Sequence, residues 1–265
     1  MYSRFQLFQK YLHYYLSASN SKGHGIHSPF VFDFATKVLN DRKVADNYNA
    51  IEELRLQLSK SRLVIEVEDF GAGAGLKGLY KRSVAEITRR SAKTKKYGQL
   101  LFRICRHYHP HILLELGTSL GLSSAYLASS DPSSKIITIE GASTVARLAK
   151  KNFDALGLRN IELVTGNFDV ILAPVMAQLP SVDLVFIDGN HRKEPVLAYF
   201  RQVLQKVNPS SLIIFDDIHW SREMEECWEI VKNHPRVMVT IDLFFMGLVF
   251  FREEFRTKQH FTIRF

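Results

Sequence analysis

Cysteine is scarce in this sequence. Cys105 and Cys227 are the only two cysteines among 265 residues, and neither lies in a metal-ligand spacing. Small secreted domains held together by disulfides need many more cysteines, so that class of protein is excluded. We therefore expect two free thiols in a chain that works in a reducing compartment.

Long apolar runs are also missing. No stretch approaches the roughly 20 apolar residues that a membrane-spanning helix needs. The opening run, MYSRFQLFQKYLHYYL, is too polar for the apolar part of a secretion signal. With 46% hydrophobic and 23% charged residues, the composition is typical of a folded globular protein. We therefore expect a cytoplasmic protein without a membrane span.

Acidic residues are few in the first part of the chain. Residues 1–110 contain 19 Lys and Arg against 9 Asp and Glu, whereas residues 111–265 contain 16 against 18. The first part thus carries a formal charge of +10 and the second part −2. Such a basic region suits nucleic acid, anionic lipid or an acidic substrate, and the plainest alternative is a solvated helix surface.

Helical spacing dominates this basic region. Residues 2–16 gather aromatic and aliphatic side chains on one helix face, which needs a partner surface. Because only two basic residues flank that face, we expect docking on the rest of the chain or on a second subunit rather than on a membrane. A homodimer therefore stays open. Residues 17–30 form a loop by composition. The further helices expected here are residues 31–41, residues 47–60, and one or two helices within residues 82–108.

From residue 111 onward, apolar runs alternate with amphipathic stretches. This alternation indicates a doubly wound parallel sheet of α/β class with right-handed crossovers. The expected strands are residues 111–116, 135–140, 161–165, 182–188, 211–216, 236–244 and 246–253. The expected helices are residues 121–130, 142–157, 168–178, 192–207 and 221–233. The last two strands follow each other so closely that they should pair as an antiparallel hairpin.

The stretch HILLELGTSLGLS at residues 111–123 organises this region. Its apolar strand runs into a turn bracketed by Gly117 and Gly121, and a glycine without a Cβ lets a nucleoside approach the backbone. The next strand, KIITIE, ends at Glu140. A nucleotide-binding strand-helix-strand unit places its acid for the ribose hydroxyls at this distance.

Together, ELGTSLGLS and ITIEG resemble the first motif and the following acid of class I S-adenosylmethionine-dependent methyltransferases, in particular the small-molecule O-methyltransferases. The resemblance implies a seven-stranded, mostly parallel Rossmann-like sheet. It makes residues 105–265 a methyltransferase domain and leaves residues 1–104 as a helical basic region for covering the site, binding substrate or oligomerisation. The cofactor-binding residues that it implies are Glu115, Gly117, Thr118, Ser119, Gly121, Ser123, Glu140, Gly141, Asn167, Phe168 and Asp188.

A second glycine-rich run, RLVIEVEDFGAGAG at residues 62–75, also matches a cofactor-binding strand and turn. No second strand ending in an acid follows it at the required distance. We therefore interpret residues 71–78, which include the glycines of 71–75, as a loop of the basic region.

Polar residues follow the fourth and fifth strands of the expected sheet. FIDGNH supplies Asp188 and His191, and IFDDIHW supplies Asp216 and Asp217. Three carboxylates gathered at one sheet edge would repel one another unless neutralised, and Mg²⁺ is the cation that oxygen ligands favour. The structural alternative is that these side chains only cap helices.

This constellation resembles the metal-dependent O-methyltransferases. The catechol-type enzymes carry Asp-Asn after the fifth strand, where this chain has Asp216-Asp217. The macrolide-sugar enzymes are closer, with an Asp-x-x-His element and two adjacent acids. The resemblance implies that Asp188, Asp216 and Asp217 bind Mg²⁺ and that His191 acts as general base, with Asp188 as the second catalytic residue.

The leading hypothesis is S-adenosylmethionine-dependent O-methylation of a small-molecule or sugar hydroxyl with metal assistance. RNA methylation through the basic region is an alternative, although the chain lacks an Asn/Asp-Pro-Pro-aromatic element and a Pro-Cys motif. A cofactor-binding protein without turnover is another alternative, which the intact cluster of carboxylates and histidine disfavours.

Overall fold

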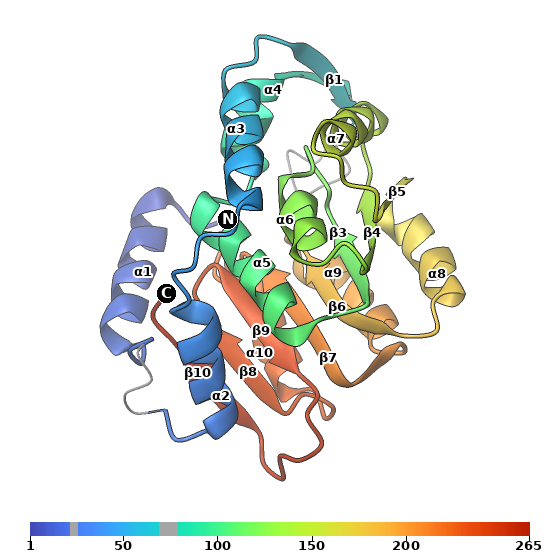
Figure 1. The fold of residues 1–265 in the computed structure, drawn as a ribbon. Helices are drawn as coiled ribbons and strands as arrows, with labels where there is room; N and C mark the ends of the chain where they lie inside the picture. The colour runs from blue at the N-terminus through green and yellow to red at the C-terminus, as the bar shows by residue number, and fades with distance from the viewer. Residues whose placement is uncertain (22–25, 69–78) are drawn as a thin grey trace. The chain divides into compact units, whose positions relative to one another are not determined.

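The computed structural model describes residues 1–21, 26–68 and 79–265. They form two compact units, one of Met1–Asp41 with Leu172–Phe265 and one of Arg42–Ile171. In Figure 1 the first unit combines the blue start of the chain with its orange and red end. The predicted division into residues 1–104 and 105–265 concerns family boundaries and stays a prediction.

The unit Arg42–Ile171 contains the first three predicted strands of the large sheet. They are β3 (Ile112–Leu116), β4 (Lys135–Glu140) and β5 (Ile161–Thr165), paired in parallel in the order β3-β4-β5. Leu114 and Ile139 are fully buried, as expected for strands covered on both faces. The helices that follow these strands are α6 (Leu122–Ser130), α7 (Ser143–Ala155) and α8 (Phe168–Gln178), which continues past residue 171.

The same unit holds most of the basic region. Its helices are α3 (Asn47–Ser59), α4 (Val84–Ser91) and α5 (Lys95–Tyr108). The helix predicted from residue 82 begins later, because Ser83 caps α4 by accepting a hydrogen bond from the Glu86 amide. Residues 82–83 belong instead to β2 (Leu79–Ser83), which pairs antiparallel with β1 (Val64–Glu68). The predicted loop at residues 71–78 lies outside the described residues.

The other unit contains the remaining five strands. β6 (Val182–Ile187) and β7 (Val207–Asp216) run parallel, and α9 (Lys193–Val203) and α10 (Arg222–Asn233) follow them. β8 (Val239–Asp242) and β9 (Met246–Phe250) form the predicted antiparallel hairpin, and β9 also pairs antiparallel with β7. The order in this unit is β10-β8-β9-β7-β6.

The predicted α/β class and mostly parallel sheet are confirmed, with differences at the end of the chain. The large sheet has eight strands rather than seven, because β10 (Gln259–Thr262) pairs in parallel with β8. β8 is shorter than the predicted strand 236–244, since only four residues pair with both neighbours.

The first helices of the chain lie in this unit. α1 (Arg4–Ser17) begins with a capping box, in which Ser3 accepts from the Gln6 amide and Gln6 accepts from the Ser3 amide. α2 (Pro29–Phe34) continues into the π-helical turn η1 (Ala35–Leu39). The helix predicted from residue 31 thus begins earlier, because the fixed φ of Pro29 suits the first turn.

Two expectations from composition concern the whole described chain. Cys105 and Cys227 are free and buried, as predicted. Among the described residues, every helix is too short or too polar to cross a membrane.

Gly121 provides a test of packing at the start of α6. Its φ is 83°, and a Cβ there would lie 2.4 Å from Phe153 Cε1 in α7. Gly121→Ala should therefore lower the free energy of unfolding by about 3 kcal/mol, measured by urea denaturation, from overpacking and left-handed backbone together.

Gly157→Ala is the matched control for this substitution. Gly157 also has a positive φ, 69°, but no described heavy atom lies within 4 Å of the added Cβ. The expected loss is about 1 kcal/mol from the backbone alone. Equal losses in the two variants would contradict the packing argument.

Candidate functional site

The turn after β3 is the first candidate ligand site. Gly117, Ser119 and Gly121 have positive φ angles of 108°, 48° and 83°. The amides of Gly117 and Thr118 both donate to the carbonyl of Ile139 in β4, at 3.0 and 3.2 Å. The turn is therefore held to the neighbouring strand by its backbone, and Gly117 has no side chain to keep a ligand away.

A buried carboxylate supports this turn. Glu115 is fully buried, and its Oε2 accepts hydrogen bonds from Ser124 and from Thr138, the latter at 2.6 Å. The Thr118 hydroxyl lies 2.6 Å from that of Thr138, which extends the network into the turn. Burial raises the pKa of Glu115 to about 6, against the opposing effect of neighbouring hydroxyls. Within the described part of the chain, Oε1 has no hydrogen-bond partner.

Glu140 fixes the same turn from the end of β4. Its Oε2 accepts from the Ser119 amide at 2.8 Å, and its Oε1 accepts from the Ala142 amide at 2.9 Å. Burial raises the pKa of Glu140, and the backbone amides oppose that shift. A carboxylate oxygen accepts more than one hydrogen bond, so this group retains acceptor capacity for ligand hydroxyls.

The other predicted cofactor residues of this unit lie at the same strand ends. Ser123 is buried in the first turn of α6, and Gly141 directly follows β4. Asn167 precedes α8, where its Oδ1 accepts from the Asp169 amide at 2.9 Å, and the half-buried Phe168 begins the helix. Ligands of parallel sheets bind at the carboxyl ends of strands. The unoccupied acceptor of Glu115 and the bare glycine turn suit a nucleoside linked to an amino acid.

Asp188, His191 and Asp216 form a second candidate site, in the unit that contains β6 and β7. One potential ligand atom from each residue lies within 4.8 Å of those of the other two. The register pairs Ile187 with Phe215, so the two aspartates follow at the same level of adjacent parallel strands. His191 Nε2 lies 3.7 Å from Asp188 Oδ1, which is beyond hydrogen-bonding distance.

The charges of this group need a counter-charge. One oxygen of Asp188 and one of Asp216 lie within 4.8 Å of each other, and two negative charges that close repel each other by about 3 kcal/mol or more at an effective dielectric constant of about 20. Protonated His191 or a divalent cation supplies the neutralisation, and two carboxylates beside an imidazole fit such a cation. Asp217 lies outside the group of three, and its predicted role as a ligand stays a prediction.

Strained backbone accompanies these residues. Asn190, His191 and Asp217 have φ angles of 68°, 43° and 52°. The Asn190 side chain holds its loop by donating to the Tyr199 hydroxyl at 3.1 Å and accepting from Arg192 Nε at 3.0 Å. Such strain costs of order 1–3 kcal/mol per residue and gathers at functional sites.

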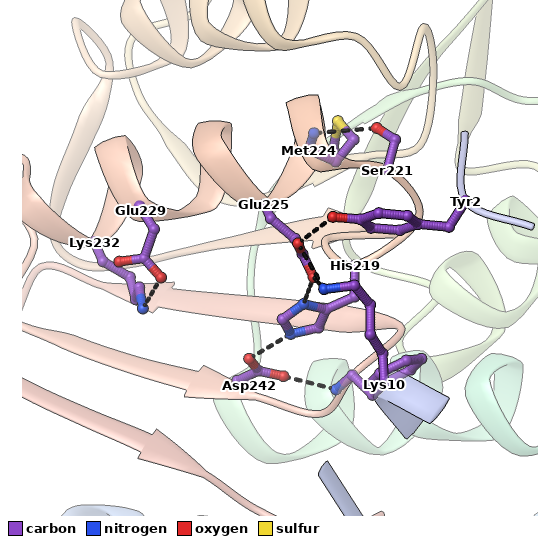
Figure 2. A network of polar contacts seen from close by, with 10 residues as sticks. Tyr2, Lys10, His219, Ser221, Met224, Glu225, Glu229, Lys232 and Asp242 are labelled. Atoms are coloured by element: carbon purple, nitrogen blue, oxygen red, sulfur yellow. Dashed lines mark hydrogen bonds and ion pairs between the residues drawn. The ribbon is translucent and has the colours of Figure 1, made fainter. Parts of the chain in front are cut away.

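The second histidine of this edge is part of a structural network. His219 Nδ1 lies 3.0 Å from Glu225 Oε1, and Nε2 lies 2.7 Å from Asp242 Oδ2, as Figure 2 shows. Burial lowers the pKa of His219, but the carboxylates of Asp242 and Glu225 outweigh this effect, so the pKa is raised overall. Each ring nitrogen faces one carboxylate oxygen, so His219 links Asp242 in β8 to Glu225 in α10.

Three supporting residues went unnoticed at the sequence level. Ser124 and Thr138 hold Glu115, and Asn190 holds the loop that carries His191. Thr138 could have been noticed in the sequence, because it is the single hydroxyl residue in the apolar run KIITIE. The register places it opposite Glu115.

Comparison with known proteins finds methyltransferases. A family model described as a methyltransferase domain matches residues 114–218. The transmembrane O-methyltransferase homolog of Rattus norvegicus is 31% identical over 121 residues, which cover 44% of this chain and 45% of that protein. The chain spans less than half the length of the curated O-methyltransferases that it matches.

Two solved structures are similar in fold. The O-methyltransferase TomG from Streptomyces achromogenes, in complex with SAM, gives a TM-score of 0.53 at 21% identity and covers 61% of this chain and 82% of its own. The SAH-bound methyltransferase of Podospora anserina gives 0.59 at 12% identity and covers 96% and 98%. The predicted Rossmann-like methyltransferase fold is confirmed. Residues 114–218 therefore match a methyltransferase domain, and the chain shares its fold with solved methyltransferases.

Proposed function

We propose that this protein is an O-methyltransferase that transfers the methyl group of S-adenosylmethionine to a hydroxyl of a small molecule or sugar, with help from a divalent cation. The observation that carries the proposal is the group of Asp188, His191 and Asp216. Binding the cofactor requires no such group. Activating a hydroxyl requires a base, and two neighbouring carboxylates supply the ligands for a cation.

The cofactor is assigned to the ends of β3, β4 and β5. Glu140 accepts hydrogen bonds from the ribose hydroxyls while it keeps those from the Ser119 and Ala142 amides. Glu115 Oε1, which has no hydrogen-bond partner among the described residues, is assigned as an acceptor for the methionine part of the cofactor. Asn167 and Phe168 are assigned to the adenine, as a polar group and an apolar ring.

The acceptor is assigned to the ends of β6 and β7. Mg²⁺ held by Asp188 and Asp216, with Asp217 as a further predicted ligand, would lower the pKa of an acceptor hydroxyl. His191 Nε2 takes the hydroxyl proton. The oxygen then attacks the methyl carbon in line, an O–C bond forms as the S–C bond breaks, and S-adenosylhomocysteine leaves. Correct alignment supplies most of the rate.

Relatives support this reaction class. The matched proteins of Rattus norvegicus and Aspergillus flavus are both named as O-methyltransferases or their homologs. Because the matches cover less than half of each relative, the acceptor is inferred only as far as its hydroxyl group. A cytoplasmic location and a homodimer stay predictions.

The direct test of the proposed function is an acceptor screen. The full chain is incubated with methyl-labelled cofactor and panels of catechols, other phenols and sugars, with and without a chelator. We expect label on an acceptor hydroxyl and loss of transfer after chelation. Transfer confined to RNA, or no transfer although the cofactor binds, would contradict O-methylation of a small molecule.

Glu140 tests the ribose assignment. Glu140→Ala removes the acceptor for the ribose hydroxyls and one support of the turn, the hydrogen bond from the Ser119 amide, so calorimetry should detect no S-adenosylmethionine binding. Glu162→Ala is the control, because Glu162 is exposed on the adjacent strand β5 and pairs only across the surface with Lys135. Near wild-type affinity in Glu140→Ala would overturn the assignment.

Glu115 tests the cost of a buried charge. Its pKa rises from an ordinary 4.5 to about 6 in the folded chain, so stability falls as pH rises through that window and stays low above it. Glu115→Gln should remove this loss and stabilise the ligand-free chain by about 2 kcal/mol at pH 8, while weakening cofactor binding. Thermal unfolding from pH 4 to 8 measures the effect, and a stability difference independent of pH would contradict it.

Asp216 tests the cation. Mn²⁺ titrated into the full chain should bind, as followed by the electron paramagnetic resonance of the free ion, and Asp216→Asn should abolish binding. Glu229→Gln, at an exposed carboxylate of α10, should bind Mn²⁺ as the wild type does. A wild-type chain that leaves Mn²⁺ free in the presence of cofactor would argue against the metal.

A further inference from the structure

Helix α1 is held to its unit by one face. Tyr2 donates to Glu225 at 2.7 Å, and Lys10 Nζ lies 2.9 Å from the same carboxylate (Figure 2). Tyr11 and Tyr14 pack against Phe244, with ring centroids 5.1 and 5.3 Å apart. The docking predicted from the sequence concerned the face that carries Phe5, Phe8, Leu12 and Tyr15, and that face is exposed. Apart from Tyr2, the contacts come from a different face, which fixes α1 in place as a folded helix.

A second face of α1 is apolar and exposed. We call it the α1 stripe, and its residues recur at helical spacing along the full length of the helix. Their exposed fractions are 68%, 61%, 46%, 44% and 71% for Phe5, Phe8, Leu12, Tyr15 and Leu16. Single exposed apolar residues need no explanation, but a continuous aromatic and aliphatic row marks an interaction surface.

The surroundings of the α1 stripe carry positive charge. Residues 1–32 contain no Asp or Glu, and Arg4 and His13 are exposed beside the stripe. Arg264, close to the other end of the chain, places its guanidinium carbon 4.2 Å from the centroid of the Tyr15 ring. The acid closest by contact, Glu225, is already bonded to Tyr2 and Lys10 on the docked face.

We infer that the α1 stripe binds the surface of an anionic lipid bilayer. Phenylalanine, leucine and tyrosine on one side of a helix with cations at its edge are the features of an interfacial helix, which lies in the headgroup region without crossing the membrane. Anionic headgroups would pair with the positive charges of Arg4 and Arg264 beside the stripe.

A second copy of the chain is the competing occupant, and its charge is unfavourable. Two α1 stripes packed together would bring like charges from both copies to one interface, and residues 1–32 offer no carboxylate to pair with them. A bilayer also requires no refolding, because the capping box and the contacts of the docked face already fix α1 as a helix. This surface is separate from the residues assigned to methyl transfer.

Vesicle sedimentation with the full chain tests the inference. The wild type should sediment with vesicles of phosphatidylcholine containing about one third phosphatidylserine, much less with phosphatidylcholine alone, and less as salt is added. The double variant Phe5→Ser/Phe8→Ser should bind about a hundredfold more weakly, because each of the two rings contributes about a factor of ten or more when buried. Arg4→Glu should weaken binding to the anionic vesicles.

Matched controls separate the stripe from general stickiness. Leu56→Ser and Val170→Ser change apolar residues of α3 and α8 that are 53% and 66% exposed, and both variants should bind vesicles as the wild type does. Unchanged melting temperatures would show that the stripe variants are folded. The inference fails if the wild type ignores anionic vesicles, if the stripe variant binds equally well, or if the wild type is a dimer that the stripe variant converts to a monomer.

Discussion

One buried carboxylate, hydrogen-bonded across two strands, underlies the candidate cofactor site. Glu115 in β3 accepts from Thr138 in β4 and from Ser124 in α6, so it ties together the two strands and the helix that surround the glycine turn. A neutral residue there would cost less to bury. The chain keeps a charged group with an open acceptor at this point, which is the usual compromise between stability and ligand binding.

Backbone strain marks the same strand ends as the charged groups. Of the six non-glycine residues with positive φ in the described chain, four directly follow β3, β6 or β7, namely Ser119, Asn190, His191 and Asp217. These four lie where ligands of parallel sheets bind, whereas His109 ends α5 and Phe244 lies between β8 and β9. These turns are held by hydrogen bonds that the Glu140 carboxylate, the Tyr199 hydroxyl and the Phe245 carbonyl accept.

Much of the fold could be predicted because a continuous apolar run indicates a strand that is buried on both faces. This pattern does not depend on which strand pairs with it. Glu140 could be found because one strand-helix-strand unit fixes its distance from the glycine turn. The parts that escaped prediction depend on register and dihedral angles. Thr138 is important because the register places it opposite Glu115. β10 is a short strand whose residues alternate in exposure. The position of Asp217 depends on a positive φ that no residue pattern predicts.

The attachment of α1 decides how this protein can be dissected. Tyr2, Lys10 and Tyr14 reach more than 200 positions along the chain to bind Glu225 and Ile263. A fragment begun at the predicted boundary, residue 105, would lose these partners and uncover Phe244 in the same unit that carries Asp188 and Asp216. Deleting the basic region would therefore remove part of the buried cluster around Phe244. A fragment that is inactive for this reason would give no information about catalysis.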